Sequence, residues 1–202
     1  MTALELDTPH GPARAHIDAA GDPAGALVLG HGAAGGVSAP DLAAAAQAAR
    51  EARFSVALVE QPYHVAGRRS VAPAHQLDAA WIAVVEHLRA GPFAGLPLVA
   101  GGRSSGARVA CRTAGAVEAI GVLCLAFPLH PPGKAGDPSK SRLPELDAVT
   151  VPVLVVQGAS DPFGHPGPGP HRRVVEVPGN HSLRTNLDRI QSAVREWLDE
   201  LR

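Results

Sequence analysis

Residues 98–108 read Leu98-Val99-Ala100-Gly101-Gly102-Arg103-Ser104-Ser105-Gly106-Ala107-Arg108. The apolar residues before the glycines are typical of a buried strand, and the residues from Ala107 to Arg112 are typical of the first turns of a helix. Between these elements lies a Gly-x-Ser-x-Gly sequence. In this strand–turn–helix setting the turn is so sharp that it holds the central serine in a strained conformation with its hydroxyl exposed. We therefore predict that Ser104 is a nucleophile.

The same glycines allow a second interpretation, because a glycine-rich loop between a strand and a helix can bind a phosphate. The chain has 22 glycines among 202 residues, so a serine can also be flanked in this way by chance. The stretch contains neither Gly-Lys-Ser/Thr nor Gly-x-Gly-x-x-Gly. The nucleophile hypothesis therefore depends on suitable partners farther along the chain.

The composition indicates one domain that spans residues 1–202 and has a single core, and 46% hydrophobic residues is ordinary for a globular protein. Aromatic residues make up only 3%, so the core must consist mainly of Ala, Val and Leu, which suits helices packed on a parallel sheet. The net charge of −1 gives no electrostatic reason to bind nucleic acid or an anionic membrane. We expect a small-molecule substrate, no nucleic-acid or membrane partner, and a monomer or a small homo-oligomer.

The cysteines and the N-terminal residues indicate the cellular compartment. Cys111 and Cys124 lie on apolar elements and lack Cys-x-x-Cys spacing, so we expect them to be reduced core residues. The N-terminus carries Glu5 and Asp7 and no apolar leader, and the longest apolar run, Ala119 to Phe127, is too short to span a bilayer. We expect a cytoplasmic protein.

Apolar runs alternate with helical patterns along the chain. The expected strands are Ala13–Asp18, Ala26–Leu29, Ser55–Glu60, the run from Leu98, Ile120–Leu125, Val153–Gln157 and Arg172–Val177, the first of them an exposed antiparallel edge strand. The expected helices are Asp41–Arg53, Ala74–Ala90, the helix that begins near Ala107, a short one near Leu143–Leu146, and Leu187–Leu201. This alternation predicts an α/β fold, a doubly wound and mostly parallel sheet of about six to seven strands with helices on both faces. Its ligand site should lie at the carboxyl ends of the strands.

A serine nucleophile needs a base, and the base needs a carboxylate that orients it. On such a sheet the expected chain order is serine, acid, histidine. His181 follows the last strand, where a loop can bring an imidazole to Ser104, although a loop histidine can also be a solvated surface residue. Asp161 follows the strand Val153–Gln157, although the proline after it also suits a turn aspartate. Asp137 is the alternative acid.

The oxyanion should be held by backbone N–H groups. We expect one donor to be Ser105, at the start of the helix after the nucleophile. The other should be Ala33, in the glycine-rich loop Gly30–Gly36 after the first buried strand. The alternative for this loop is a flexible turn with no chemical role.

Several motifs together resemble the α/β-hydrolase superfamily: Leu27–Gly36, Gly102–Gly106, Gly158–Asp161 and Gly179–His181, in this order. More narrowly, Glu60–Tyr63, Gly67–Arg69, Phe127–Lys134 and Gln157–Gly164 resemble a small family without a lid domain. That family includes bacterial predicted hydrolases and the testis-expressed and histone-acetyltransferase-complex proteins of animals, and is distantly similar to dienelactone hydrolases. The resemblance implies the fold and the triad Ser104, Asp161 and His181, and no substrate. The segment Phe163–Pro170 departs from the pattern because it is unusually rich in Gly and Pro.

Further polar residues suggest how a substrate is bound. Tyr63, Arg68, Arg69, His130 and Lys134 are candidate substrate-binding residues, and with Arg142 the basic ones could form a cationic rim that attracts an anionic ester. A solvated basic face is the common alternative. The ten histidines show no metal-ligand spacing, so we expect neither a metal nor a cofactor.

The sequence thus predicts a serine esterase or lactonase that acts on a small soluble substrate through an acyl-enzyme. An acyltransferase would use the same residues. A non-catalytic binding or scaffold protein with this fold is the alternative from another class.

Overall fold

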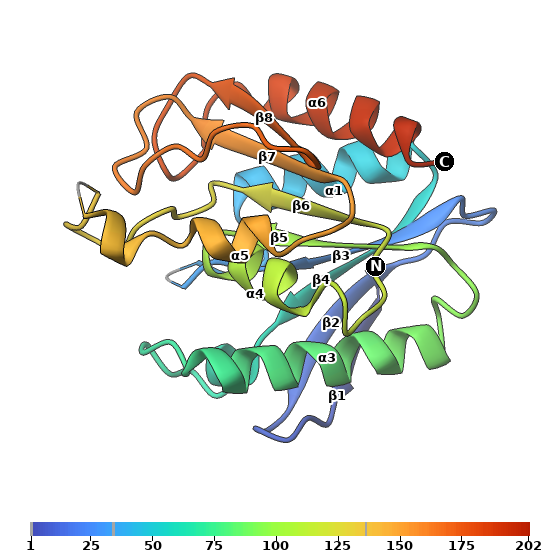
Figure 1. Cartoon of the computed structure of the whole chain (residues 1–202). Helices are drawn as coiled ribbons and strands as arrows, with labels where there is room; N and C mark the ends of the chain where they lie inside the picture. Colours follow the sequence, from blue (N-terminus) through green and yellow to red (C-terminus); the bar gives the residue numbers. More distant parts are fainter. Residues whose placement is uncertain (1, 34, 136) are drawn as a thin grey trace.

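The computed structural model describes residues 2–33, 35–135 and 137–202 (Figure 1). Its strands are β1 (Thr2–Leu6), β2 (Ala13–Asp18), β3 (Gly25–Gly30), β4 (Phe54–Glu60), β5 (Leu98–Arg103), β6 (Gly121–Leu125), β7 (Val153–Gly158) and β8 (Arg172–Val177). Its helices are α1 (Pro40–Glu51), α2 (Pro62–Val65), α3 (Ala74–Ala90), α4 (Ser105–Thr113), α5 (Leu143–Asp147) and α6 (Leu187–Glu200), with a 3-10 helix η1 at Pro138–Lys140.

All eight strands join one sheet in the order β1-β2-β4-β3-β5-β6-β7-β8. From β4 to β8 every neighbouring pair is parallel, whereas β2 is antiparallel to both β1 and β4. The parallel strands therefore end at one edge of the sheet, on the left in Figure 1. The loops that follow β3, β5, β7 and β8 emerge there, which confirms the expected side for the functional loops.

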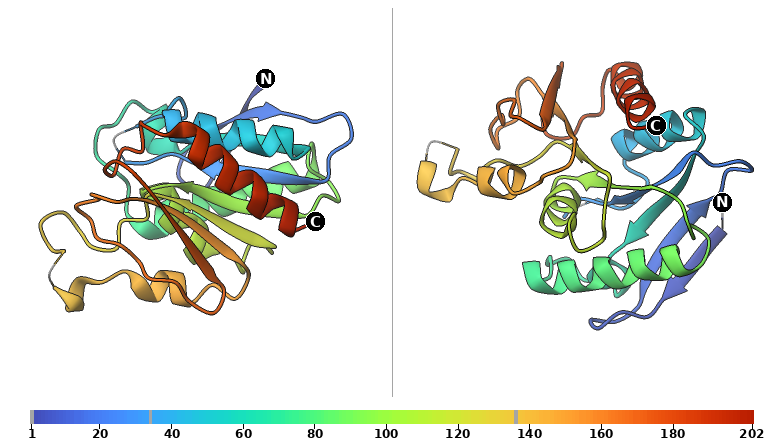
Figure 2. Two further views of the ribbon diagram at one scale, coloured as in Figure 1. Left: turned by 90° about the horizontal axis from the view of Figure 1, so that it is seen from above. Right: turned by 45° about the vertical axis from the view of Figure 1, so that its right-hand side comes forward.

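Helices cover both faces of the sheet, as expected. Helices α1 and α6 lie together on one face, and α3, α4 and α5 lie on the other (Figures 1 and 2). Strands β3, β6 and β7 are buried along their whole length, which is why they appear in the sequence as continuous apolar runs and not as alternating ones.

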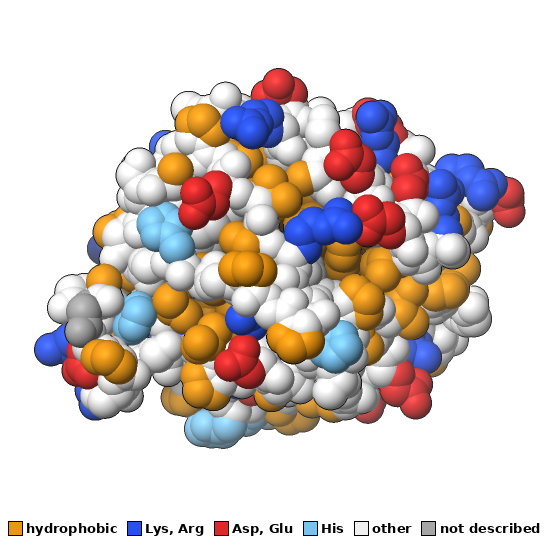
Figure 3. Space-filling view, turned by 45° about the horizontal axis from the view of Figure 1, so that its top comes forward, with side chains coloured by type: hydrophobic (Ala, Val, Ile, Leu, Met, Phe, Trp, Pro, Cys, Tyr) orange, Lys and Arg blue, Asp and Glu red, His pale blue; other side chains and the backbone are white. Residues whose placement is uncertain are grey.

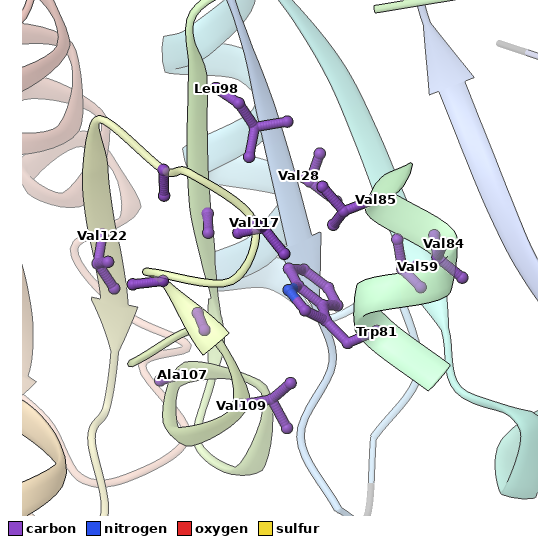
Figure 4. Packing of buried hydrophobic residues seen from close by; sticks show 14 of the residues in the cluster. Val28, Val59, Trp81, Val84, Val85, Leu98, Ala107, Val109, Val117 and Val122 are labelled. Atoms are coloured by element: carbon purple, nitrogen blue, oxygen red, sulfur yellow. The ribbon is translucent and has the colours of Figure 1, made fainter. Parts of the chain in front are cut away.

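Helix α3 shows how the apolar pattern sets the packing. Its buried residues fall on one stripe: Leu77, Ala80, Trp81, Val84, Val85 and Leu88. Trp81 is fully buried, and its ring packs over β3 among Val28, Val85 and Val117 (Figure 4). A Cβ added to Gly30 would lie 3.2 Å from that ring, so the glycine makes room for the indole.

The expected strands and long helices are present with small differences at their ends. Strand β1 was not predicted from the sequence, so the sheet has eight strands instead of the expected six to seven. It was also wrong to place Ala13–Asp18 at the sheet edge, because β1 pairs with that strand and forms the edge itself. Only Leu6 of β1 is buried, so its burial pattern is too weak to show in the sequence, and the strand depends on pairing with β2.

The surface carries charges of both signs. On the face drawn in Figure 3, Lys and Arg side chains are interspersed with Asp and Glu, in keeping with the net charge of −1. None of the helices in the described part of the chain combines the length and the apolar character needed to cross a membrane.

Three glycines bring β3, β5 and α4 into backbone contact. A Cβ on Gly102 would lie 2.6 Å from the carbonyl oxygen of Gly30 and 2.7 Å from the carbonyl carbon of Gly106. A Cβ on Gly106 would collide with the same Gly30 carbonyl and lie 2.9 Å from the carbonyl oxygen of His31. These neighbours are main-chain atoms of central elements, so a side chain at either position forces the elements apart.

We expect the substitution Gly106→Ala to lower the free energy of unfolding by about 1–2 kcal/mol, because an overpacking cost of about 2–3 kcal/mol outweighs the gain of about 1 kcal/mol in helix propensity. Gly115→Ala is the control, since a Cβ there has no neighbour within 4 Å. Urea unfolding of the two variants and the wild type measures the difference. A Gly106→Ala protein as stable as Gly115→Ala would contradict this account of the turn.

Candidate active site

Ser104 occupies the turn between β5 and α4 in a backbone conformation that residues other than glycine rarely adopt, with φ 52° and ψ −108°. Its backbone N–H donates to the carbonyl of Leu125 on β6 (2.9 Å), which fixes the turn to the neighbouring strand. The side chain remains half-buried. This is the strained turn that the Gly-x-Ser-x-Gly sequence predicts, and its strain is sustained by the glycine packing on either side.

The structure brings Ser104, His181 and Asp161 together in one chain of hydrogen bonds. The Oγ of Ser104 lies 2.9 Å from Nε2 of His181, and Nδ1 of His181 lies 2.7 Å from Oδ2 of Asp161. When the Ser104 hydroxyl donates a hydrogen bond to Nε2, the neutral imidazole carries its proton on Nδ1. The Nδ1–H then donates a hydrogen bond to the Asp161 carboxylate. Asp161 follows β7 and His181 follows β8, so the parallel arrangement of these strands delivers both side chains to the same edge as Ser104.

Asp161 is held by two further donors, and one comes from a residue that the sequence analysis overlooked. The Nε2 of Gln157 lies 2.8 Å from Oδ2 of Asp161, and the backbone N–H of Phe163 donates to Oδ1 (2.9 Å). Gln157 is completely buried within the otherwise apolar β7. A buried amide needs a polar partner, so a glutamine in an apolar strand is the signal that could have identified it. The contact from Phe163 also makes Asp161 a turn residue, as the proline after it suggested.

The loop after Asp161 packs against the imidazole. The rings of Phe163 and His181 meet edge to face with centroids 4.3 Å apart. His130, a predicted substrate-binding residue, is buried behind this loop, where its backbone N–H donates to the carbonyl of Phe163 (2.9 Å). A Cβ on Gly164 would lie 3.0 Å from Nδ1 of His130. His130 therefore supports the loop that follows Asp161 through contacts with Phe163 and Gly164.

The predicted oxyanion loop is shaped by His31. This buried imidazole donates from Nδ1 to the carbonyl of Gly32 (2.8 Å) and accepts at Nε2 from the backbone N–H of Gln61 (3.2 Å). Burial lowers its pKa, which favours the neutral ring that this pattern requires. A Cβ on Gly32 would lie 3.4 Å from the Cβ of Ser104, so this loop passes beside the serine one residue before Ala33. Ala34, also part of this loop, lies outside the described residues.

Tyr63 and Arg68 line a hollow of about 170 Å³ between the β1–β2 turn, α2 and α3, and none of Ser104, Asp161 and His181 lines it. Tyr63 is buried, and burial raises its pKa to about 12. Its hydroxyl lies 3.4 Å from the carbonyl of Ala33. Tyr63 therefore packs against the predicted oxyanion loop, and Arg68 is an exposed residue of the same hollow.

The remaining residues that the sequence singled out lie in two connections, one after α2 and one between β6 and β7. Arg69 is exposed after α2, and Lys134 is exposed in the β6–β7 connection. Arg142 donates to the carbonyls of Pro128 (3.1 Å) and His130 (3.3 Å), so it braces this connection from within. Asp137, the alternative acid, accepts from the backbone N–H of Ser139 (2.9 Å) and caps η1. In the part of the chain that the structure describes, no group of three or more His, Cys, Asp or Glu residues has the arrangement of a metal site.

Beside Ser104, Arg103 forms an ion pair that sequence reasoning did not identify. Its Nε lies 2.9 Å from Oδ2 of Asp41, whose side chain is completely buried in the first turn of α1. Burial raises the pKa of the Asp41 carboxyl to about 6, although the Arg103 guanidinium opposes this shift. Arg103 Nη2 also donates to the carbonyl of His181 (3.1 Å). The arginine within the Gly-Arg-Ser-Ser-Gly sequence could have suggested a role, but Asp41 gave no signal beyond a good helix start.

Comparison with known proteins agrees with this architecture. Residues 23–186 match the family described as "Alpha/beta hydrolase domain". No curated protein matches the sequence significantly. Among solved structures, a serine hydrolase without a lid from Xanthomonas campestris is 24% identical, with a TM-score of 0.77 over 98% of this chain and 94% of that one. Est1E from Butyrivibrio proteoclasticus is 17% identical, with a TM-score of 0.78 over 100% and 99% of the two chains. The dienelactone hydrolase from Anabaena variabilis is 16% identical, with a TM-score of 0.77 over 98% and 96%.

The raised pKa of Asp41 predicts a pH dependence of stability. The folded chain binds this proton more tightly than the unfolded chain, so the contribution is complete below about pH 4 and is lost as the pH rises through about 6. Relative to Asp41→Asn, the free energy of unfolding of the wild type should fall by up to about 3 kcal/mol between about pH 4 and pH 7.

Denaturant unfolding of both proteins across this range measures that difference. Asp22→Asn is the matched control, because Asp22 also pairs with an arginine but its side chain is 92% exposed. A difference between wild type and Asp41→Asn that stays constant with pH would show that Asp41 has the same pKa in both states.

Proposed function

The chain belongs to the α/β-hydrolase family, and we propose that it is a serine hydrolase that cleaves a small soluble carboxylic ester or lactone through an acyl-enzyme. The observation that carries this proposal is the hydrogen-bond chain from Ser104 through His181 to Asp161. A serine hydroxyl is almost entirely protonated at neutral pH, so it attacks a carbonyl only with a base in contact. A scaffold protein has no physical need for a strained serine with both partners in place.

Each residue has a role that follows from its contacts. The Oγ of Ser104 attacks the ester carbonyl carbon while its proton passes to Nε2 of His181. Asp161 accepts the Nδ1 proton in a hydrogen bond, holds the required tautomer and stabilises the imidazolium that forms. The backbone N–H groups of Ala33 and Ser105 hold the negative oxygen of the tetrahedral intermediate. The imidazolium then protonates the leaving alcohol oxygen as the bond between carbonyl carbon and alcohol oxygen breaks.

The acyl-enzyme is removed by the reverse sequence. His181 takes a proton from water, the resulting hydroxide oxygen bonds to the acyl carbon, and the bond to Oγ breaks. The proton returns from Nε2 to Ser104, and the carboxylic acid leaves. An added alcohol in place of water would yield acyl transfer, so the same residues support both outcomes and the partition between them is set by access to the site.

The substrate class is argued from the connections around the site and from related proteins. In its described residues, the segment between β6 and β7 contains only η1 and the five-residue helix α5. It therefore offers little to enclose a long acyl chain, and a short substrate suits such a site. The similar proteins include a dienelactone hydrolase and Est1E, for which a structure with bound ferulic acid exists. Cys111 and Cys124 carry free thiols, which supports the proposal of a cytoplasmic location.

A fluorophosphonate probe and a short p-nitrophenyl ester test the proposal. We expect the wild type to gain one adduct on Ser104 and to hydrolyse the ester. Ser104→Ala should lose the adduct and lower kcat by up to about 10⁶-fold, since the attacking oxygen is gone. Intact mass and initial rates provide the two readouts.

Ser192→Ala is the matched control, because Ser192 is exposed on α6 and has no part in the hydrogen-bond chain of Ser104, His181 and Asp161. It should label and hydrolyse like the wild type. A folded wild type that neither labels nor hydrolyses any short ester would favour the scaffold alternative, and full hydrolysis by Ser104→Ala would assign the reaction to another residue.

A further inference from the structure

We propose that Arg103 is a positioning residue for the hydrolysis: clamped by Asp41, it ties the nucleophile turn, the oxyanion loop and the His181 loop to one another. This inference rests on the proposed function of Ser104 and His181. It concerns a side chain whose contacts are with Asp41, Gly32 and the carbonyl of His181, and which acts through the groups it holds.

Three contacts of the guanidinium carry the inference. Nε lies 2.9 Å from Oδ2 of Asp41 in α1. Nη2 donates to the backbone carbonyl of His181 (3.1 Å). Nη1 packs over Gly32, where a Cβ would lie only 2.7 Å from it. One planar group therefore touches the loop before Ala33, the loop that carries His181, and a carboxylate anchored in a helix.

Because Arg103 is next to Ser104 in the chain, its side-chain contacts also affect the position of the serine. Arg103 precedes Ser104 directly, so its main chain belongs to the strained turn while its side chain holds the carbonyl of His181. Both ends of the hydrogen bond from Ser104 Oγ to His181 Nε2 are thus fixed by one residue. A displacement of about 1 Å between a nucleophile and its base can lower a rate by about 100-fold, so this tie sets the distance on which catalysis depends.

Asp41 supplies the rigidity. Its side chain is completely buried, and Oδ1 accepts from the backbone N–H of Leu42 (3.0 Å). A buried carboxylate cannot move away from its partner without a large cost in free energy. Asp41 therefore keeps the guanidinium from turning out into solvent, and the Arg103 side chain is only 15% exposed. The rigid fork of an arginine can reach Asp41 and the His181 carbonyl together, whereas a lysine ammonium is a single point charge.

The substitution Arg103→Lys separates this role from general stability. It keeps a positive charge beside Asp41, and we expect it to leave the thermal midpoint close to that of the wild type. It should lower kcat for a short p-nitrophenyl ester about 10- to 100-fold with little change in KM, because the distance between Ser104 and His181 is no longer fixed. The 2.7 Å contact with Asp161 predicts a low-field proton resonance for the His181 Nδ1–H in the wild type, and this resonance should broaden in Arg103→Lys.

Arg112→Lys is the matched control. Arg112 lies on the same helix that follows Ser104 and pairs with Asp78 at 2.6 Å, with a side-chain exposure of 19% close to that of Arg103. It should keep kcat, KM and the low-field resonance of the wild type. If Arg103→Lys does not fold, the double variant Arg103→Gln with Asp41→Asn removes both buried charges and should show the same loss of kcat in a folded protein.

The outcomes separate the proposed hydrolase function from the positioning role of Arg103. A wild type without a fluorophosphonate adduct overturns the proposed function itself. A wild type that labels, together with an Arg103→Lys or double variant of unchanged kcat, overturns the positioning role alone. A raised KM with unchanged kcat also overturns it, since Arg103 would then bind substrate. A loss of kcat with an intact fold and an undisturbed Arg112→Lys control supports it.

Discussion

The contact between the Gly30 carbonyl and the backbone at Gly102 and Gly106 is the constraint on which the rest of the structure depends. It lets α4 leave β5 at a sharp angle, and the angle forces Ser104 into a conformation with φ 52°. The strained conformation persists because β3 and β5 lie in the middle of the sheet and α4 packs against them, with buried apolar layers on both faces of the sheet. The same contact brings the end of β3, and so the loop with His31 and Ala33, to the side of the serine.

Around that turn, the site is assembled from the ends of separate strands and stabilised by buried polar groups. Gln157 steadies Asp161, His31 shapes the loop before Ala33, and the Asp41–Arg103 pair holds the carbonyl of His181. Each of these groups is costly to bury without partners. Each has at least one partner here, but among the described residues Oε1 of Gln157 has no hydrogen-bond partner, and Asp41 Oδ2 and Arg103 Nε meet as an ion pair and not in hydrogen-bond geometry. The loss of any one partner would leave another buried polar group unsatisfied, so these contacts hold the loops of the site in place.

Sequence reasoning succeeded where one local pattern carries the information. The helix Ala74–Ala90 and the buried strands follow from periodicity, because burial on one stripe or on both faces imposes a fixed spacing of apolar residues. It failed for Thr2–Leu6, where only Leu6 is buried and the strand exists through pairing with Ala13–Asp18. Such pairing joins residues through a turn and leaves little trace in a five-residue segment.

The sequence by itself determined the fold class, the strained serine and the chain order of Ser104, Asp161 and His181, because those depend on glycine sterics and on the direction in which parallel strands run. Only the tertiary structure decided which charged residues meet. Arg68, Arg69, Lys134 and Arg142 appeared equivalent in the sequence, yet Arg142 braces its own loop and Arg68 borders a separate hollow. Arg103 found its partner in Asp41, 62 positions earlier in the chain. Long polar side chains act at the distances that folding creates, and those distances are not encoded in any local pattern of residues.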